Sequence, residues 1–535
     1  MSLPRIRVKA GSSRPAARGA LASPEAYDAG DVTAGELRVW HPDREHPDSE
    51  LGWARGAVTA RARDLARNNG YAAGAVQKEI DGVIGANFRP SAKPDHRALG
   101  ISREAAAEVA DEMECAWRLW ADDPGFRCDA TRTQSWGGMA GLAYRSYVLD
   151  GDALAMLHWR ADAQGYAGHL ATAVRVLDAD LLGNPQDAAD AATLRGGVEV
   201  DAHGAAVAYH LRREHPLSVW GSGAYVWNRI EREEAWGRPR VVHFFDKHRD
   251  GQTRGVSRFA PIIEALKMED KYGRVELASA VLGAILGLFV SSQLDPETVS
   301  DLLDDGAAGY LALDSARTTL AETKGLTFGG VRIPVLPPGD DIKAVAATRP
   351  NGNFALFEAA VLRRIAAGIG ISYEQLSSDW SQVNYSSARA ALIEIWRGWT
   401  ARRQQFARRF CDPIRWAVIE EAIDAGLVTL PRGAPRFDQA PGAWLRAKWI
   451  GPGRGFVDPV KEAQAAAMRV ALGLETMEDV TAELTGNDYQ DNLAQIAQEI
   501  SQMPNGVLHP AQEKFTELLG GRPGMADTEQ GARGA

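Results

Sequence analysis

Two pairs of closely spaced carboxylates are the residues of this chain best suited to catalysis. Asp150 and Asp152 flank one glycine, and Asp178 and Asp180 flank one alanine. Carboxylates at this spacing can hold Mg²⁺, which activates water in many nucleases. Both pairs lie beside predicted strands, where Asp-Gly and Asp-Ala-Asp commonly form turns. A metal-dependent DNA-processing enzyme, a nuclease that uses Asp178 and Asp180, therefore stays as the alternative interpretation.

Three further groups of residues resemble known sites without completing them. His243, Asp246 and His248 could meet at a metal, but their spacing is not diagnostic of one. The Gly-Pro-Gly-Arg-Gly loop at 451–455 lacks the lysine of a phosphate-binding loop. Gly221-Ser222-Gly223 lacks the outer glycines of a nucleophile elbow. We predict that the protein is not an enzyme and that it holds neither a cofactor nor a metal.

The composition is that of a folded protein with an acidic balance. Its 535 residues are 45% hydrophobic and 24% charged, which is typical of globular domains. The net charge of -10 argues against tight binding to nucleic acid through a broadly basic surface. Three scattered cysteines fit a reducing cytosol and predict no disulfide or zinc framework. The Pro- and Gly-rich start of the chain, basic in its first twenty residues, predicts a flexible N-terminal arm over 1–50 and no signal peptide.

The hydrophobic pattern predicts an α+β fold in which long helices surround one antiparallel β region. Apolar residues recur at helical spacing over 51–84, with a break at Asn68-Asn69-Gly70, and over 104–120. Between 144 and 245 the period shifts towards two, and residues 201–204 predict a hairpin turn. Further helices are predicted at 260–292, 354–369, 387–425, 458–473 and 476–502, and short strands at 309–314 and 330–336.

One segment within these helices has the length of a membrane span. Residues 277–294 contain no charged side chain, so a membrane pore is a second alternative. Serines, a glutamine and glycines dilute the segment, and no Lys/Arg cluster accompanies it. A helix that is covered by protein is the stronger interpretation, and we predict no membrane partner.

The stretch GISYEQLSSDWSQVNYSSARAAL, residues 370–392, is the most unusual in the chain. It joins two predicted helices but consists largely of Ser, Gln, Asn, Tyr and Trp, with three charged residues. A surface loop would carry more charge, and a core segment fewer hydroxyls and amides. The helix that follows is rich in arginine and has Glu394 as its nearby acid. This composition raises the question of what the loop and the helix contact.

Four segments together resemble the lambda-type family of tailed-bacteriophage portal proteins. The four segments are residues 61–85, 241–267, 370–397 and 449–466, and they occur in the same order as in the family. The resemblance as a whole covers about residues 50 to 500. Two positions depart from the expected pattern. Ala86-Asn87 replaces a more glycine-rich turn, and Ser257 stands where proline is expected.

The resemblance implies a ring, usually of twelve subunits, at one vertex of the capsid. Double-stranded DNA would enter through this ring without sequence-specific contacts, driven by the terminase large subunit, and would later leave through it. A head-tail adaptor and the major capsid or scaffold protein are the other implied partners. The protein would lie in the virion, and in the host cytoplasm during assembly.

The family's parts can be carried onto this chain. Residues 51–259 resemble the wing, and 260–369 the paired stem helices with a clip at about 295–345. Whether the helix at 260–292 belongs to the stem or to the wing stays open. Residues 370–386 resemble the tunnel loop, 387–430 the long wing and crown helix, 431–502 the crown region and 503–535 a disordered tail.

Two sets of site residues follow from this resemblance. The polar residues of the tunnel loop are expected to face DNA, unless the loop packs between domains: Gln375, Ser377, Ser378, Trp380, Ser381, Gln382, Asn384 and Tyr385. The arginines of the next helix are expected to meet acidic surface on a neighbouring subunit, unless they form an exposed charged face: Arg389, Arg397, Arg402 and Arg403.

Overall fold

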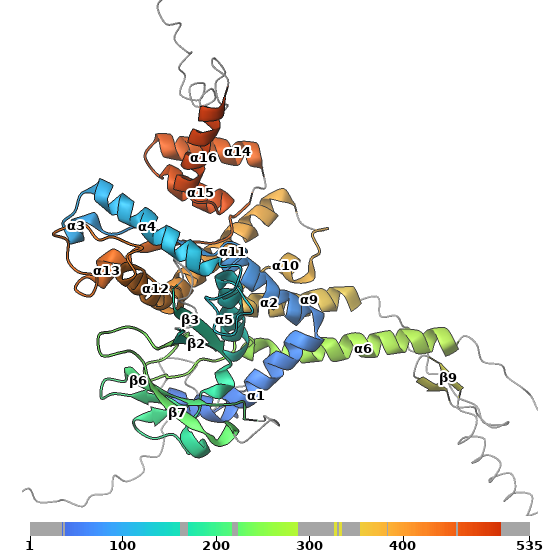
Figure 1. The fold of residues 1–535 in the computed structure, drawn as a ribbon. Helices are drawn as coiled ribbons and strands as arrows, with labels where there is room; N and C mark the ends of the chain where they lie inside the picture. Colours follow the sequence, from blue (N-terminus) through green and yellow to red (C-terminus); the bar gives the residue numbers. More distant parts are fainter. Residues whose placement is uncertain are drawn as a thin grey trace, which may run out of the picture.

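The structure is a computed structural model, and it describes most of the chain between residues 38 and 503. The described ranges are 38–160, 170–216, 223–286, 326–328, 331–333, 354–381, 384–455 and 458–503, together with Gly35. Within them long helices are combined with small antiparallel sheets, which confirms the predicted α+β class (Figure 1). The predicted strand at 309–314 lies outside the described residues.

The first two helices meet at the break that the sequence predicts. α1 (Pro47–Asn68) ends at Asn69, whose N–H donates to Leu65 O. The same Asn69 begins α2 (Gly70–Val83), because its side chain accepts a hydrogen bond from the N–H of Ala72. One asparagine therefore ends one helix and caps the next.

Tryptophan rings form the centre of the main core. α4 (Arg103–Ala121), which the sequence predicts, supplies Trp117, and α5 (Trp136–Asp150) supplies Trp136, with their ring centroids 5.2 Å apart. Trp449, which stacks on Phe88, lies in β11 (Ala447–Ile450), and β11 pairs antiparallel with β1 (Arg89–Ala92). This pairing of distant segments was not predicted. Two short helices, α3 (His96–Leu99) and α13 (Pro441–Trp444), lie next to each other.

The predicted β region begins later than expected. Residues 144–150 belong to α5, where Tyr144 and Tyr147 are buried in the helical core. Packing of these aromatic side chains outweighs their preference for strands. The helix ends at Gly151, whose φ of +86° and close approach to the backbone of Val256 exclude a side chain. The strand β2 (Asp152–Trp159) follows directly.

The β region itself consists of two antiparallel sheets. β2 lies between β3 (Thr172–Leu177) and β8 (Val241–Phe245). The second sheet has the order β4 (Leu194–Arg195), β5 (Val198–Val200), β6 (Ala206–Arg212) and β7 (Trp227–Glu231). The predicted hairpin at 201–204 is present, and the Asp201 side chain accepts from the N–H groups of His203 and Ala205.

A long helix projects from the body and has a second helix beside it. α6 (Ile263–Leu286) and α9 (Phe354–Ile369) meet through Tyr272, whose ring stacks on Phe354 at 5.5 Å (Figure 1). The two-stranded β9 (Leu326–Phe328) and β10 (Val331–Ile333) confirm part of the predicted strand at 330–336. Among the described residues, helices long and apolar enough to cross a membrane are absent. Part of the 277–294 segment lies outside those residues.

The predicted helix at 387–425 contains a turn of π-helix. α11 (Tyr385–Phe406) passes through a π-turn (Ala407–Cys411) into α12 (Asp412–Asp424). Within it, the N–H of Asp412 donates to Ala407 O, five residues back. Pro413 explains the change, because it has no N–H for the carbonyl of Arg409 and its ring would crowd that carbonyl in a regular helix.

The last helices form a small group at one end of the molecule. α14 (Pro459–Ala471) is followed by α15 (Met477–Thr485) and α16 (Tyr489–Gln502) (Figure 1). A single helix was predicted over 476–502, but Gly486 ends α15 with a φ of +72°. Gly453 packs against the backbone there, with 2.8 Å between its ideal Cβ position and Gly486 N. A side chain at either glycine would separate the loop from α15.

Candidate functional site

The segment 370–381 leaves α9 and immediately forms a short helix. Gly370, at a φ of +85°, turns the chain, and Ile371 is buried. Ser372 then begins α10 (Tyr373–Ser377), because its Oγ accepts from the N–H of Gln375, while Gln375 Oε1 accepts from the N–H of Ser372. This capping box gives the polar residues at the start of the loop a local structural role.

Two of the eight predicted DNA-facing side chains are used inside the loop. Gln375 belongs to the capping box, and Ser377 Oγ donates to Tyr373 O at 2.8 Å and accepts from the N–H of Asp379 at 3.2 Å. Four others lie at the surface: Ser378, Trp380, which is 44% exposed, Ser381 and Asn384. Gln382 and the side chain of Tyr385 lie outside the described residues.

A lysine of α2 holds the loop to the body. Lys78 Nζ donates to the carbonyl of Gln375 and, at 3.0 Å, to Ser378 Oγ. Burial lowers the pKa of Lys78. Leu376, 5% exposed, packs into the main core. The role of Lys78 was not predicted, since nothing in the sequence near residue 78 indicates a partner near residue 375.

The four predicted interface arginines fall into two pairs. Arg389 and Arg397 are exposed on α11. Arg402 and Arg403 contact their own chain, and the expectation that they meet a neighbouring subunit stays a prediction. Arg402 Nη1 lies 2.5 Å from Glu79 Oε1. Arg403 is 8% exposed and donates to the carbonyls of Val83 and Gly82 at 2.8 Å each.

The position of Arg403 has a simple physical cause. Val83 and Gly82 lie in the last turn of α2, where carbonyl groups have no partner within the helix. A guanidinium satisfies these carbonyls and meets the negative end of the helix dipole. Burial lowers the pKa of Arg403 to about 10. Arg403 thus fixes α11 against α2.

Glu79 is the second link between α2 and α11. Its side chain has no exposed surface and accepts from Tyr144 Oη at 3.1 Å, Trp399 Nε1 at 3.3 Å and Arg402 Nη1. Tyr144 lies in α5, so one carboxylate joins three helices. Lys78 and Glu79 are neighbours in sequence, and together they connect the polar loop to the helical core.

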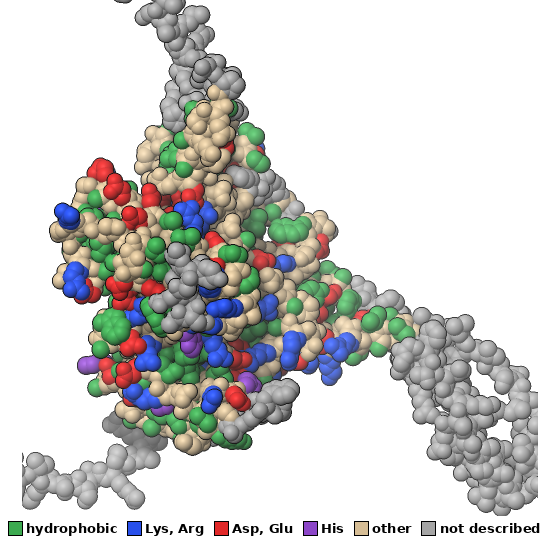
Figure 2. Space-filling view, in the orientation of Figure 1, with side chains coloured by type: hydrophobic (Ala, Val, Ile, Leu, Met, Phe, Trp, Pro, Cys, Tyr) green, Lys and Arg blue, Asp and Glu red, His purple; other side chains and the backbone are tan. Residues whose placement is uncertain are grey.

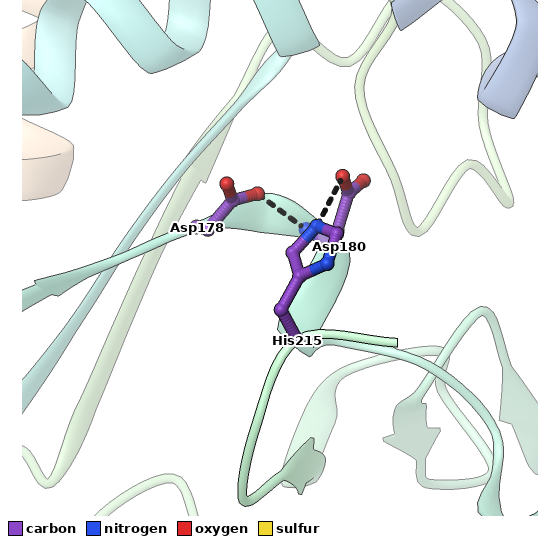
Figure 3. Close-up of side chains that lie close together, drawn as sticks. All are labelled: Asp178, Asp180 and His215. Carbon is purple, nitrogen blue, oxygen red and sulfur yellow. Dashed lines mark hydrogen bonds and ion pairs between the residues drawn. The ribbon is translucent and has the colours of Figure 1, made fainter. Parts of the chain in front are cut away.

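The candidate nuclease carboxylates form part of an ion-pair network. Ligand atoms of Asp178, Asp180 and His215 all lie within 4.8 Å of one another (Figure 3). Arg63 of α1, however, contacts Asp178 and Asp180 at 2.7 Å each, and it also pairs with Asp150. Burial raises the pKa of Asp178, but hydrogen bonds from Asp180 N–H and Arg63 outweigh it, so the pKa lies below its usual range. A guanidinium therefore already supplies the cation that these carboxylates need.

In the other pair, Asp150 and Asp152, both carboxylates also have partners within the chain. Asp152, with no exposed surface, accepts from Arg254 Nε at 2.8 Å and contacts His243 Nε2 at 3.0 Å. Asp246 accepts from Tyr147 Oη, and His248 is exposed. His243, Asp246 and His248 therefore do not meet at one point.

The glycine-rich loop at 451–455 packs against α14 and α15. Arg454 pairs with Glu483 at 3.2 Å and with Glu462 at 3.4 Å. The cation that could have met a phosphate is thus shared between two carboxylates of α14 and α15. Ser222 of the other glycine-rich motif lies outside the described residues.

Comparisons with known proteins agree with one family over most of the chain. Residues 33–403 match the family described as phage portal protein, lambda family. The chain is 34% identical to the portal protein of Escherichia phage N15 over 522 residues, covering 95% of this chain and 96% of the relative. It is 33% identical to portal protein B of Escherichia phage lambda over 495 residues, covering 90% and 91%.

A solved structure matches at lower similarity. A chain from the neck of the native GTA particle, computed with C12 symmetry, has a TM-score of 0.34 and 15% identity, covering 81% of this chain and 98% of that one. The sequence relatives give no support to the nuclease alternative, because their names are those of portal proteins. The chain belongs to the lambda family of phage portal proteins, which are structural proteins and not enzymes.

Proposed function

We propose that copies of this chain form a ring at one capsid vertex and that double-stranded DNA passes through its centre. The observation that carries this proposal is the loop at 370–381, which is anchored to α2 by Lys78 and to the main core by Leu376 and leaves Trp380 and Ser381 at the surface. A channel loop must stay in place while DNA moves past it. An anchored base with a polar tip that carries no cation meets that need.

The charge of the loop suits a conduit better than a clamp. Six to ten phosphate contacts with Lys or Arg change DNA affinity by about 10³–10⁵-fold between 50 and 200 mM salt. The tip presents no cation among its described residues, and the Lys78 ammonium is directed at the loop's own carbonyl. A hydrogen bond from the N–H of Ser381 lowers the pKa of Asp379, so this exposed carboxylate repels phosphate at neutral pH.

The charge of the whole subunit points the same way. The chain carries a net charge of -10. On the face shown in Figure 2, acidic and basic side chains are interspersed over the body. Such a surface keeps a duplex mobile, because long-range attraction to phosphate is weak.

The parts of the portal are proposed along the boundaries that the resemblance implies. Residues 51–259 form the wing, 260–369 the stem with a clip at about 295–345, and 370–386 the tunnel loop. The contact of Tyr272 with Phe354 makes α6 and α9 neighbours, which favours the stem over the wing for α6. Residues 387–430 form the long helix and 431–502 the crown, with 1–50 and 503–535 as the flanking arm and tail.

The partners follow from the position in the particle. A ring needs head-to-tail contacts between unlike surfaces of neighbouring subunits. Arg389 and Arg397, both exposed, are the arginines of α11 that we propose for this contact. We propose three further partners: the terminase large subunit, a head-tail adaptor, and the major capsid or scaffold protein. We also propose that the ring assembles in the host cytoplasm.

The test adds a charge at the tip of the loop. Ser381→Lys places one cation per subunit where the duplex should pass, and Ser381→Gln adds similar length without charge. We expect the lysine variant to assemble but to release DNA more slowly, with a delay that disappears as salt rises. The measurement is the rate of DNA release from filled particles at several salt concentrations. Equal rates for the two variants and the parent at low salt would overturn the placement of this loop in the channel.

A further inference from the structure

A cavity of about 430 Å³ lies between the two β-sheets and the π-turn, away from the tunnel loop. Its walls come from β5, β6 and β8 and from the start of α12. Four basic side chains line it, Arg232, Lys247, Arg408 and Arg409, against one carboxylate residue, Glu233. In a chain with an acidic balance, this concentration of cations needs an explanation.

Three of the four cations form no close ion pair in the described part of the chain, although Arg408 interacts electrostatically with the carboxylate of Asp412. Arg232, Arg408 and Arg409 are exposed and make neither a side-chain hydrogen bond nor an ion pair with any described residue. Lys247 pairs with Asp250 at 3.0 Å. Elsewhere several half-buried arginines, among them Arg63 and Arg402, meet carboxylates at close range. Three guanidiniums without an ion pair therefore lie around this one cavity.

The local fold sets the backbone position of two of these arginines and holds the side chain of one. Arg408 and Arg409 lie in the π-turn that Pro413 imposes. The Arg409 guanidinium lies 5.2 Å from the ring centre of Phe244 and 5.7 Å from that of Phe245, at distances typical of cation–π contacts. Stacking holds the guanidinium plane and leaves its N–H groups for hydrogen bonds. π-turns of this kind occur often at functional sites.

The chemistry of the walls indicates which anion fits. A guanidinium matches a carboxylate with two parallel hydrogen bonds. Trp416, Pro413 and Val200 contribute apolar surface beside the arginines, so the site offers contacts for apolar as well as acidic side chains. The convex backbone of a duplex is too broad to enter a cavity of this size, whereas a few residues of extended peptide fit. We propose that this cavity binds a carboxylate-bearing peptide segment of a separate partner protein.

The test uses a short labelled peptide of alternating Glu and Tyr, with the same peptide carrying Gln for Glu as its matched control. Binding to the purified chain is followed by fluorescence polarisation at low salt. We expect the Glu peptide to bind at least about tenfold more tightly than the Gln peptide. Arg408→Gln with Arg409→Gln should remove most of that difference.

Two variants separate loss of the site from loss of the fold. Arg232→Gln changes a lining residue directly after β7, outside the π-turn, and should also weaken binding several-fold. Arg61→Gln with Arg67→Gln removes two exposed arginines from α1 and should leave binding unchanged. Equal affinity of the parent and the Arg408/Arg409 variant would overturn the proposal.

Two further results would also contradict it. If a labelled DNA duplex bound through the same arginines and displaced the peptide, the cavity would be a phosphate site. If peptide binding disappeared when subunits assemble, the occupant would be a neighbouring subunit and not a separate protein. Retained peptide binding in the assembled state supports the proposal, which does not depend on the role of the tunnel loop.

Discussion

Glu79→Gln is the substitution for which the structure gives the sharpest expectation. The side chain has no exposed surface and accepts hydrogen bonds from α5 and α11, including one from the charged Arg402. The amide keeps the volume but removes the charge that balances the guanidinium. Breaking one partner of a buried ion pair costs about 3–5 kcal/mol. Because Arg402 is 20% exposed, we expect a loss near the lower end, about 3 kcal/mol of unfolding free energy.

Urea unfolding of the unassembled subunit, followed by the circular dichroism of its helices, measures this loss. All variants are compared at one protein concentration, because assembly shifts apparent stability. Glu108→Gln, an exposed position on α4, is the matched control and should stay within about 0.5 kcal/mol of the parent.

A double-mutant cycle with Arg402→Gln tests the reasoning further. If Glu79 and Arg402 stabilise each other, the double variant should be more stable than the sum of the single losses predicts, by about 1 kcal/mol or more. A Glu79→Gln variant as stable as the control would refute the account of α2 as the anchor of α11. Additive losses would refute the pairing.

Three further outcomes follow from the network around the β region and α4. Asp152→Asn leaves the buried Arg254 without its carboxylate and should lower the unfolding free energy by about 3–5 kcal/mol, measured by urea unfolding. Burial raises the pKa of Glu114 from 4.5 to about 6, so the folded chain binds more protons than the unfolded chain between these values. Stability should therefore fall as pH rises from 4.5 to 6, by at most about 2 kcal/mol, and Glu114→Gln should remove that dependence. Added Mg²⁺ should leave Tm unchanged and produce no cleavage of plasmid DNA, since Arg63 already occupies Asp178; a metal-dependent rise in Tm or a nicked plasmid would contradict this.

Strongly periodic segments were predictable from local sequence. The helices at 104–120 and 354–369 and the break at Asn69 appear where the pattern places them, because spacing and capping are local properties. The segment 144–150 was misjudged, since its aromatic residues favour strands until a surrounding core is known. The pairing of β1 with β11 depends on contacts between distant parts of the chain, which local periodicity cannot indicate.

The same distinction applies to the candidate site. The position of the loop between two helices could be predicted, but its anchor could not, because Lys78 lies far from it in sequence. An arginine-rich helix normally indicates an exposed face. Arg402 and Arg403 depart from that rule because α2 offers them a buried carboxylate and unpaired carbonyls.

The mass and shape of the purified protein test the central claim most directly. We predict a closed ring with a mass of about twelve times the 57.8 kDa subunit by light scattering, and a central hole wide enough for duplex DNA by electron microscopy. A protein that stays monomeric or dimeric, both alone and with its scaffold, would contradict the proposed channel.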